Sequence, residues 1–254
     1  MDATLKDFLA EYLIALGDDE LVLAHRDSEW CGYAPILEED IAFANIALDE
    51  LGHARLWYEI AAQLREEQKE TYPDQLAFFR SASEFRSVQM NALPIGDWAF
   101  TITRQFLFDC AEVLRLQALM ESTYVPLAEA AAKLRNEEIY HQRHSQAWVK
   151  RLGLGTPESH RRMQAALDEL WPYSQQLFLP HRGEAEMVVS GLVPDSSALR
   201  THWRESVTHF LEQANLRISD DGPPPRDRTV HSQYLAHLVT EMQSVARLEP
   251  DGRW

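Results

Sequence analysis

The stretch EEDIAFANIALDELGHAR, residues 38–55, decides the fold. Its apolar residues recur at alternating steps of three and four, the period of a helix that faces a helical core. Burying Glu50 and His53 in that stripe is costly unless each has a partner. A Glu-x-x-His step is also the unit that carboxylate-bridged di-metal proteins place on two of four bundle helices. The stretch therefore predicts a core helix and directs attention to a second such step and two further acids. The full stripe is Phe43, Ile46, Glu50, His53, Trp57, Ile60 and Leu64.

Size and composition exclude several classes of protein. The chain has 254 residues, of which 45% are hydrophobic, enough to bury a sizeable core. Its formal net charge of -16 argues against binding nucleic acid or an anionic membrane surface. Cys31 and Cys110 form no CxxC pair, which excludes a zinc ribbon and fits a reducing compartment. The N-terminus lacks the pattern of a signal peptide, and no apolar run approaches the roughly 18 residues that span a bilayer. We expect a cytoplasmic protein.

Four long helices are predicted, over residues 5–29, 36–66, 98–123 and 127–152. The Gly and Pro of WCGYAP, residues 30–35, end the first helix and start the second, and Gly153 ends the fourth. Gly17 lies inside the first helix, where it costs about 1 kcal/mol relative to Ala. The first stripe is Leu9, Leu13, Leu16, Glu20 and Leu23; the third is Ile102, Phe106, Asp109, Val113, Leu116 and Met120; the fourth is Leu134, Glu138, His141, Ser145, Trp148 and Leu152.

The connections complete the predicted fold. Residues 67–97 form a long link with a short helix at about 74–87, which suits the single crossover of a ferritin-like bundle. Later helices are expected at 157–178, 197–215 and 231–248, with an exposed turn at 220–228. Strand-like alternation is absent from the sequence. The predicted class is all-α, a ferritin-like four-helix bundle with one long crossover and additional C-terminal helices. We expect a single domain over 1–254, with its core at about 5–155 and a helical extension at about 156–254.

Each of the four stripes carries ionisable residues, in the order acid, Glu-x-x-His, acid, Glu-x-x-His. Thirty residues separate the two acids of the first helix pair and 29 separate those of the second. Because a turn lies roughly midway in each pair and a helix rises about 1.5 Å per residue, the two acids of a pair come to the same level. Six oxygen and nitrogen ligands suit two Fe or Mn ions better than a tetrahedral zinc site. The predicted metal ligands are Glu20, Glu50, His53, Asp109, Glu138 and His141.

Other assignments of these residues stay open at this point. Buried polar residues can pair with one another without a metal, for example Glu50 with His53 or His141, and the site then holds no metal. Asp109 is favoured over Glu112 because Glu112 would shorten the second spacing to 26 residues. Glu137 and His144 fall off the stripe and are assigned to the surface or to the surroundings of the ligands. The sequence has no Gly-rich phosphate loop or Ser nucleophile elbow, and no catalytic or cofactor-binding residue is assigned.

The sequence from Ser28 to Arg55 resembles the C subunit of the multicomponent phenylacetyl-CoA epoxidases, the PaaC family. The resemblance continues at 97–110, 119–123, 136–156 and 231–243, so it covers nearly the whole chain. It implies a ferritin-like fold and a complex that uses O2 and reductase-delivered electrons to epoxidise the ring of phenylacetyl-CoA. In that family the A subunit carries the working di-iron site, and the C subunit is regarded as a structural partner with ligands often degraded. All six ligand positions are kept in this chain.

Three roles are therefore considered. The first is a structural partner of an A-like catalytic oxygenase subunit, working with the other epoxidase components and phenylacetyl-CoA in a homo- or hetero-oligomer. The second is a metal-loaded di-iron or di-manganese bundle that activates O2 in its own right. The third is an iron-storage or ferroxidase-like role, against which the long sequence after Leu152 argues. The resemblance favours the first.

Overall fold

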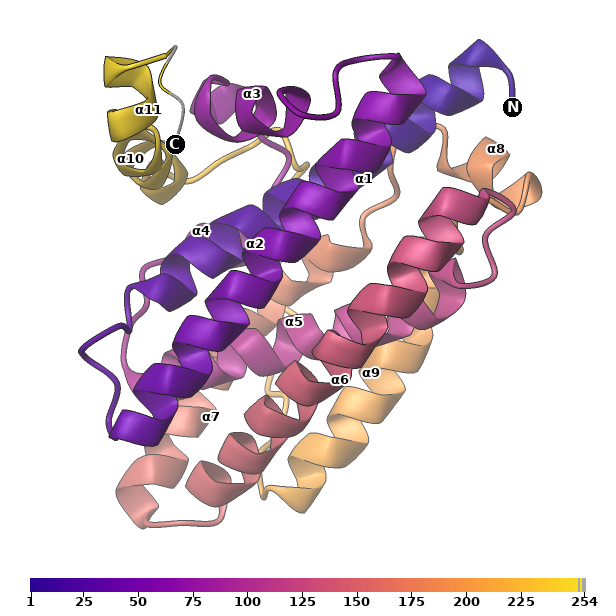
Figure 1. Ribbon diagram of the computed structural model, residues 1–254. Helices are drawn as coiled ribbons and strands as arrows, with labels where there is room; N and C mark the ends of the chain where they lie inside the picture. Colours follow the sequence, from indigo (N-terminus) through magenta and orange to yellow (C-terminus); the bar gives the residue numbers. More distant parts are fainter. Residues whose placement is uncertain (251, 253–254) are drawn as a thin grey trace. The chain divides into compact units, whose positions relative to one another are not determined.

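The computed structural model describes residues 1–250 and 252, and over those residues it contains helices and connecting segments but no β-strand (Figure 1). The predicted all-α class is confirmed. No helix among these residues combines the length and apolarity needed to cross a bilayer. The helices are α1 (Ala3–Ser28), α2 (Leu37–Arg65), α3 (Tyr72–Phe78), α4 (Gln89–Ala92), α5 (Trp98–Leu119), α6 (Val125–Gly153), α7 (Pro157–Ser174), α8 (Glu184–Val189), α9 (Ser196–Gln213), α10 (Gln233–Met242) and α11 (Ser244–Leu248), with 3-10 turns η1 (Ala82–Glu84) and η2 (Gln175–Phe178).

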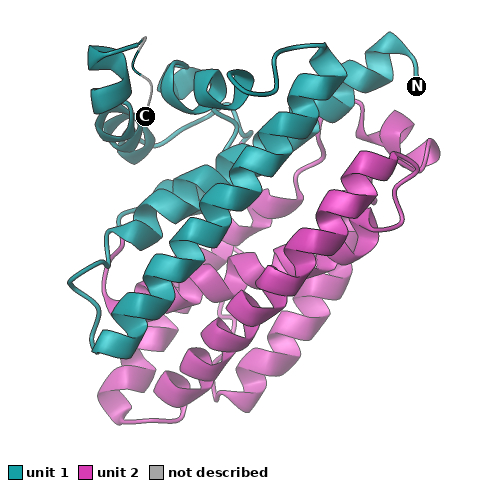
Figure 2. Ribbon diagram, viewed as in Figure 1, with its two compact units in different colours: residues 1–94, 227–254 teal, residues 95–226 magenta. Residues whose placement is uncertain are grey.

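The chain divides into two compact units, coloured separately in Figure 2. Unit 1 comprises residues 1–94 together with 227–254, and unit 2 comprises residues 95–226. The first unit is thus built from both ends of the chain. The predicted pairs of long helices follow this division, since α1 and α2 belong to unit 1 and α5 and α6 to unit 2. The single domain with a core at about 5–155 stays a prediction.

Unit 1 is organised around α1 and α2, which pack against each other along their length. Asp2 caps α1 by accepting a hydrogen bond from the Leu5 amide at 2.8 Å. Glu38, Glu39 and Asp40 lie in the first turn of α2, where acidic side chains complement the helix dipole. Every residue of the two predicted stripes is buried, including the acids and the histidine. The sequence periodicity therefore identified the inward faces of both helices.

Unit 2 is organised around α5, which packs against α6, α7 and α9. Asp97 caps α5 and Thr156 caps α7. Pro126 lies in the first turn of α6, as its lack of an amide proton favours. Between α7 and α9, Trp171 and Trp203 stack with ring centroids 4.9 Å apart. On the predicted stripe of α5, Ile102, Phe106, Asp109 and Leu116 are buried, whereas Val113 and Met120 are partly exposed.

The crossover and the C-terminal segment differ from the sequence prediction. The short helix predicted at 74–87 is only α3, because Ser81 and Glu84 form a capping box that starts the separate turn η1. The helix predicted at 231–248 is divided at Gln243, whose side-chain amide donates to the carbonyl oxygens of Ala77 and Arg80 at 3.0 and 2.9 Å. Arg228, predicted within an exposed turn, is buried. Helices α4 and α8 had no recognisable signal in the sequence.

Candidate metal-binding residues

Three of the predicted ligands come together within unit 1. Glu20 projects from the middle of α1, and Glu50 and His53 project from α2, three residues apart on one face. All three residues are at most 1% exposed. One ligand atom from each lies within 4.8 Å of the others, and His53 Nδ1 lies 3.8 Å from Glu20 Oε2. This buried cluster has the donor types and the spacing for a metal ion.

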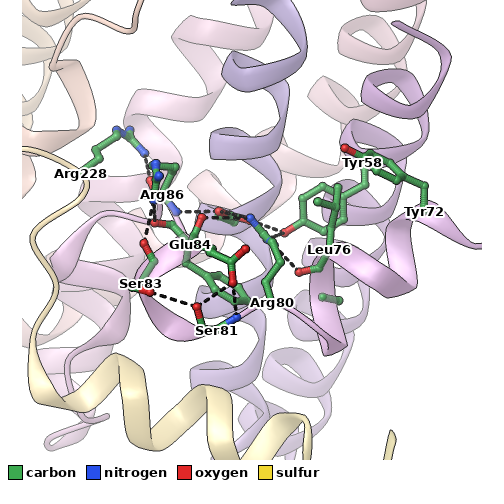
Figure 3. A network of polar contacts seen from close by, with 12 residues as sticks. Tyr58, Tyr72, Leu76, Arg80, Ser81, Ser83, Glu84, Arg86 and Arg228 are labelled. Atoms are coloured by element: carbon green, nitrogen blue, oxygen red, sulfur yellow. Dashed lines mark hydrogen bonds and ion pairs between the residues drawn. The ribbon is translucent and has the colours of Figure 1, made fainter. Parts of the chain in front are cut away.

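The residue two positions before Glu20 anchors α1 to the crossover segment. The buried carboxylate of Asp18 accepts hydrogen bonds from the Tyr58 hydroxyl at 2.6 Å and from the Arg86 amide at 2.7 Å. It also forms an ion pair with Arg80. Arg80 directly precedes the capping-box residue Ser81, and Figure 3 shows its side chain extending toward Tyr58. Burial and the charge of Asp18 raise the pKa of Tyr58 well above its ordinary value, so the hydroxyl keeps its proton.

Asp19, between Asp18 and Glu20, anchors α1 a second time. Its carboxylate accepts hydrogen bonds from the Val88 amide at 2.6 Å and from Arg228 at 2.8 Å. Its carbonyl oxygen accepts one from the Asn91 side chain at 3.0 Å. Sequence reasoning placed only Glu20 of this acidic run inside the helix stripe. The partners of Asp19 lie from 69 to 209 residues away along the chain, so helix periodicity gave no signal for them.

The other three predicted ligands come together within unit 2. Asp109 projects from α5, and Glu138 and His141 project from α6, again three residues apart. All three are fully buried. His141 Nδ1 lies 3.3 Å from Glu138 Oε1. Burial, reinforced by the charge of Glu138, raises the pKa of Asp109 well above its ordinary value.

Hydrogen bonds orient the Asp109 carboxylate from two sides. Gln105 donates to one oxygen at 2.8 Å, and the Ser145 hydroxyl donates to the other at 2.7 Å. Ser145 lies one turn beyond His141 on α6, so this bond also ties the two helices together. In metal sites generally, hydrogen bonds from the surrounding residues fix the orientation of the carboxylates that bind the metal. Neither Gln105 nor the role of Ser145 was predicted, although Ser145 lay on the expected stripe.

Glu112, the alternative acid on α5, is buried but forms an ion pair with Arg115 three residues later. Arg115 in turn donates to the Leu177 carbonyl at 2.9 Å, so the pair belongs to the packing of α5 on η2. Glu137 and His144 are partly exposed. These placements agree with the choice of Asp109, whereas its role as a ligand stays a prediction.

The predicted ligands of each unit fit a hard or borderline metal ion. Each unit offers two carboxylates and one imidazole, and all six side chains are buried. A buried set of four acids is costly unless cations or protons balance its charge. Carboxylate oxygen and imidazole nitrogen are the donors that Fe and Mn accept, and the absence of thiolate from the set argues against a structural zinc site.

Comparison with known proteins shows which family the chain matches. Residues 1–254 match the family model described as phenylacetic acid catabolic protein. The chain is 37% identical to the C subunit of the 1,2-phenylacetyl-CoA epoxidase of Escherichia coli, over 97% of this chain and 99% of that protein. It is also 26% identical to the A subunit of the same enzyme, over 64% of this chain and 51% of that protein. The all-helical structure is consistent with the ferritin-like bundle expected from the sequence.

Proposed function

Because this chain belongs to the phenylacetic acid catabolic protein family, we propose that it is a C-type subunit of an oxygenase that epoxidises the ring of phenylacetyl-CoA. The observation that carries the proposal is the match to the C subunit of the Escherichia coli epoxidase over almost the full length of both proteins. In this role the chain is a helical partner of an A-type subunit, which does the oxygen chemistry. A cytoplasmic location belongs to the proposal, since both cysteines are free.

Co-purification with the A-type subunit tests this role. The two chains are co-expressed with a tag on one of them, and the complex is measured by size exclusion with light scattering. We expect a stable complex at micromolar concentration and phenylacetyl-CoA epoxidation only when both chains and the electron-transfer components are present. Full activity of the A-type subunit without this chain would refute the role of structural partner.

The intact ligand set supports a second candidate function, a metal-loaded bundle. We propose that Glu20, Glu50 and His53 of unit 1 and Asp109, Glu138 and His141 of unit 2 are metal ligands, and that the chain binds two Fe or Mn ions. The supporting observation is that each unit places an acid and a Glu-x-x-His pair on buried helix faces. Bound metal would supply the one-electron steps by which O2 is reduced. Asp18 and Asp19 anchor α1 next to Glu20, and Gln105 and Ser145 orient the Asp109 carboxylate.

Metal analysis decides between an occupied and a vestigial site. The purified chain is analysed by mass spectrometry for Fe and Mn, together with Glu50→Ala and His141→Ala. We expect close to two metal ions per chain in the wild type and a large loss in each variant. The control is Glu137→Ala, a neighbour of Glu138 that is partly exposed and should leave the metal content unchanged. Far less than one metal ion per wild-type chain would reject the second candidate without affecting the first.

A further inference from the structure

Helix α2 carries exposed apolar side chains on its outward face, in addition to the apolar side chains of its buried face. Leu37, Ile41, Leu48 and Leu51 are 73%, 58%, 65% and 41% exposed. Ile41 and Leu48 lie on a second stripe of α2, which steps by three and four residues on the side opposite Glu50 and His53. Leu37 and Leu51 lie beside this stripe. Exposed apolar side chains that gather on one helix face point to an interaction site. We define the outward stripe as Glu38, Ile41, Asn45, Leu48, Gly52 and Arg55, all of which are exposed.

The outward stripe is complementary to itself when two copies of the helix run antiparallel. In one register Glu38 lies opposite Arg55, Ile41 opposite Gly52, and Asn45 opposite Leu48, because each pair is symmetric about the same midpoint. Arg55 pairs with Glu59 of its own helix through Nε at 3.0 Å, but its side chain is 68% exposed, so the rest of the guanidinium faces the surface. The opposed charges at the two ends specify both the antiparallel direction and the register.

Gly52 adds a steric reason for this register. A Cβ at Gly52 would meet nothing within 4 Å, so the fold of unit 1 does not require glycine there. Glycine in an exposed helix turn costs about 1 kcal/mol relative to Ala. Opposite Ile41, however, it leaves a gap into which that branched side chain packs, as small residues do at close helix contacts.

We propose that the outward stripe of α2 binds the same stripe of a second copy of this chain, around a two-fold axis between Asn45 and Leu48. An interface of this kind is isologous, so every contact is made twice. The segment from Glu38 to Arg55 spans about 25 Å at 1.5 Å per residue. One helix face buries less than the roughly 800 Å² per partner of a standard interface, so we expect a dissociation constant in the micromolar range.

Two charge reversals test the register directly. Glu38→Arg and Arg55→Glu are each purified and studied by analytical ultracentrifugation from about 1 to 200 μM. In each variant alone the symmetric pairing places like charges together twice, and we expect the dimer dissociation constant to rise at least about tenfold. When the two variants are mixed, both contacts become attractive again. The mixture should therefore dimerise within about threefold of the wild type.

Matched variants on α6 provide the control. Glu129→Arg and Arg143→Glu reverse two exposed charges on a different helix and should leave the wild-type dimer unchanged, alone and mixed. Leu48→Arg should abolish the dimer while circular dichroism shows an unchanged helical signal. A wild-type chain that is monomeric at 200 μM would overturn the proposal, as would a dimer insensitive to Leu48→Arg or a mixture no tighter than its components. Loss of A-type subunit binding by Leu48→Arg without self-association would assign the stripe to that partner and also reject the proposal.

Discussion

At the scale of single residues, Asp18 shows how a buried acid can be structural although it lies two positions from a predicted metal ligand. Three groups share its carboxylate: the Tyr58 hydroxyl, the Arg80 guanidinium and the Arg86 amide. Burial opposes the charge on Arg80, but Asp18 and Tyr58 more than offset this and raise the pKa of Arg80. The Arg80 guanidinium thus keeps its charge although it is largely buried.

Replacing Asp18 by Asn should therefore destabilise the protein strongly. The side chain of Arg80 is only 12% exposed, and in Asp18→Asn its charge would remain buried without the counter-charge. Breaking a buried ion pair from one side typically costs about 3–5 kcal/mol. Urea unfolding followed by circular dichroism measures the change. Glu158→Gln is the control, because that acid pairs with Arg161 and Arg162 at the surface and its loss should leave the midpoint unchanged. An equal midpoint for both variants would contradict the assignment.

At the scale of helices, Gly17 shows where sequence propensity fails. Judged by propensity alone, Gly17→Ala should stabilise α1 by about 1 kcal/mol. A Cβ at this position would instead lie 2.5 Å from the ring of Tyr58. That ring is held in place by the hydrogen bond from its hydroxyl to Asp18, so it has little freedom to move away.

We accordingly predict that Gly17→Ala destabilises the protein by about 1–3 kcal/mol, the usual cost of overpacking a core. Thermal unfolding measures the effect. Gly52→Ala is the matched control, since its new methyl group meets nothing within 4 Å and the helix should gain about 1 kcal/mol. Unfolding measured at two chain concentrations shows whether self-association contributes to either variant. A gain in stability for Gly17→Ala would show that Tyr58 can shift.

The long helices could be predicted from sequence because their signals are local. The stripes of α1 and α2 gave the inward faces, and α2 begins and ends within one residue of the predicted bounds. The crossover could not be predicted equally well. Its course depends on the side chains of Asp18 and Asp19, which bind backbone amides at Arg86 and Val88 far along the chain. Such contacts leave no periodic pattern in either segment.

At the scale of the whole molecule, long-range contacts of this kind also explain why the sequence did not predict which segments make up unit 1. The sequence predicts a single domain with its core at about 5–155 and a helical extension after it, and this division stays a prediction. In the structure, residues 227–254 belong to the same compact unit as residues 1–94. Arg228 binds Asp19, and the carbonyl of Val230 accepts a hydrogen bond from Gln89. The six candidate ligands were predictable because each lies on an apolar stripe, whereas their supporting residues mostly do not.

The return of the C-terminal segment to unit 1 makes a prediction about stability. Deleting residues 227–254 removes the Arg228–Asp19 pair and the hydrogen bonds of Gln243 to the Ala77 and Arg80 carbonyls. It also removes Leu235, Leu238 and Val239, which are buried on the face of α10. We expect local opening of the crossover and the middle of α1, because a buried carboxylate and an apolar surface become exposed to water there.

Hydrogen exchange with mass spectrometry measures this opening segment by segment. Protection should fall in residues 72–92 and around Asp19 in the truncated chain, while α5, α6, α7 and α9 keep their protection because none of their contacts within unit 2 is lost. A shorter truncation of residues 249–254 retains Arg228, Gln243 and α10, and should exchange like the full chain. Equal loss of protection in both units would mean that they unfold as one cooperative body, and unchanged exchange in residues 72–92 would mean that the C-terminal segment does not stabilise unit 1.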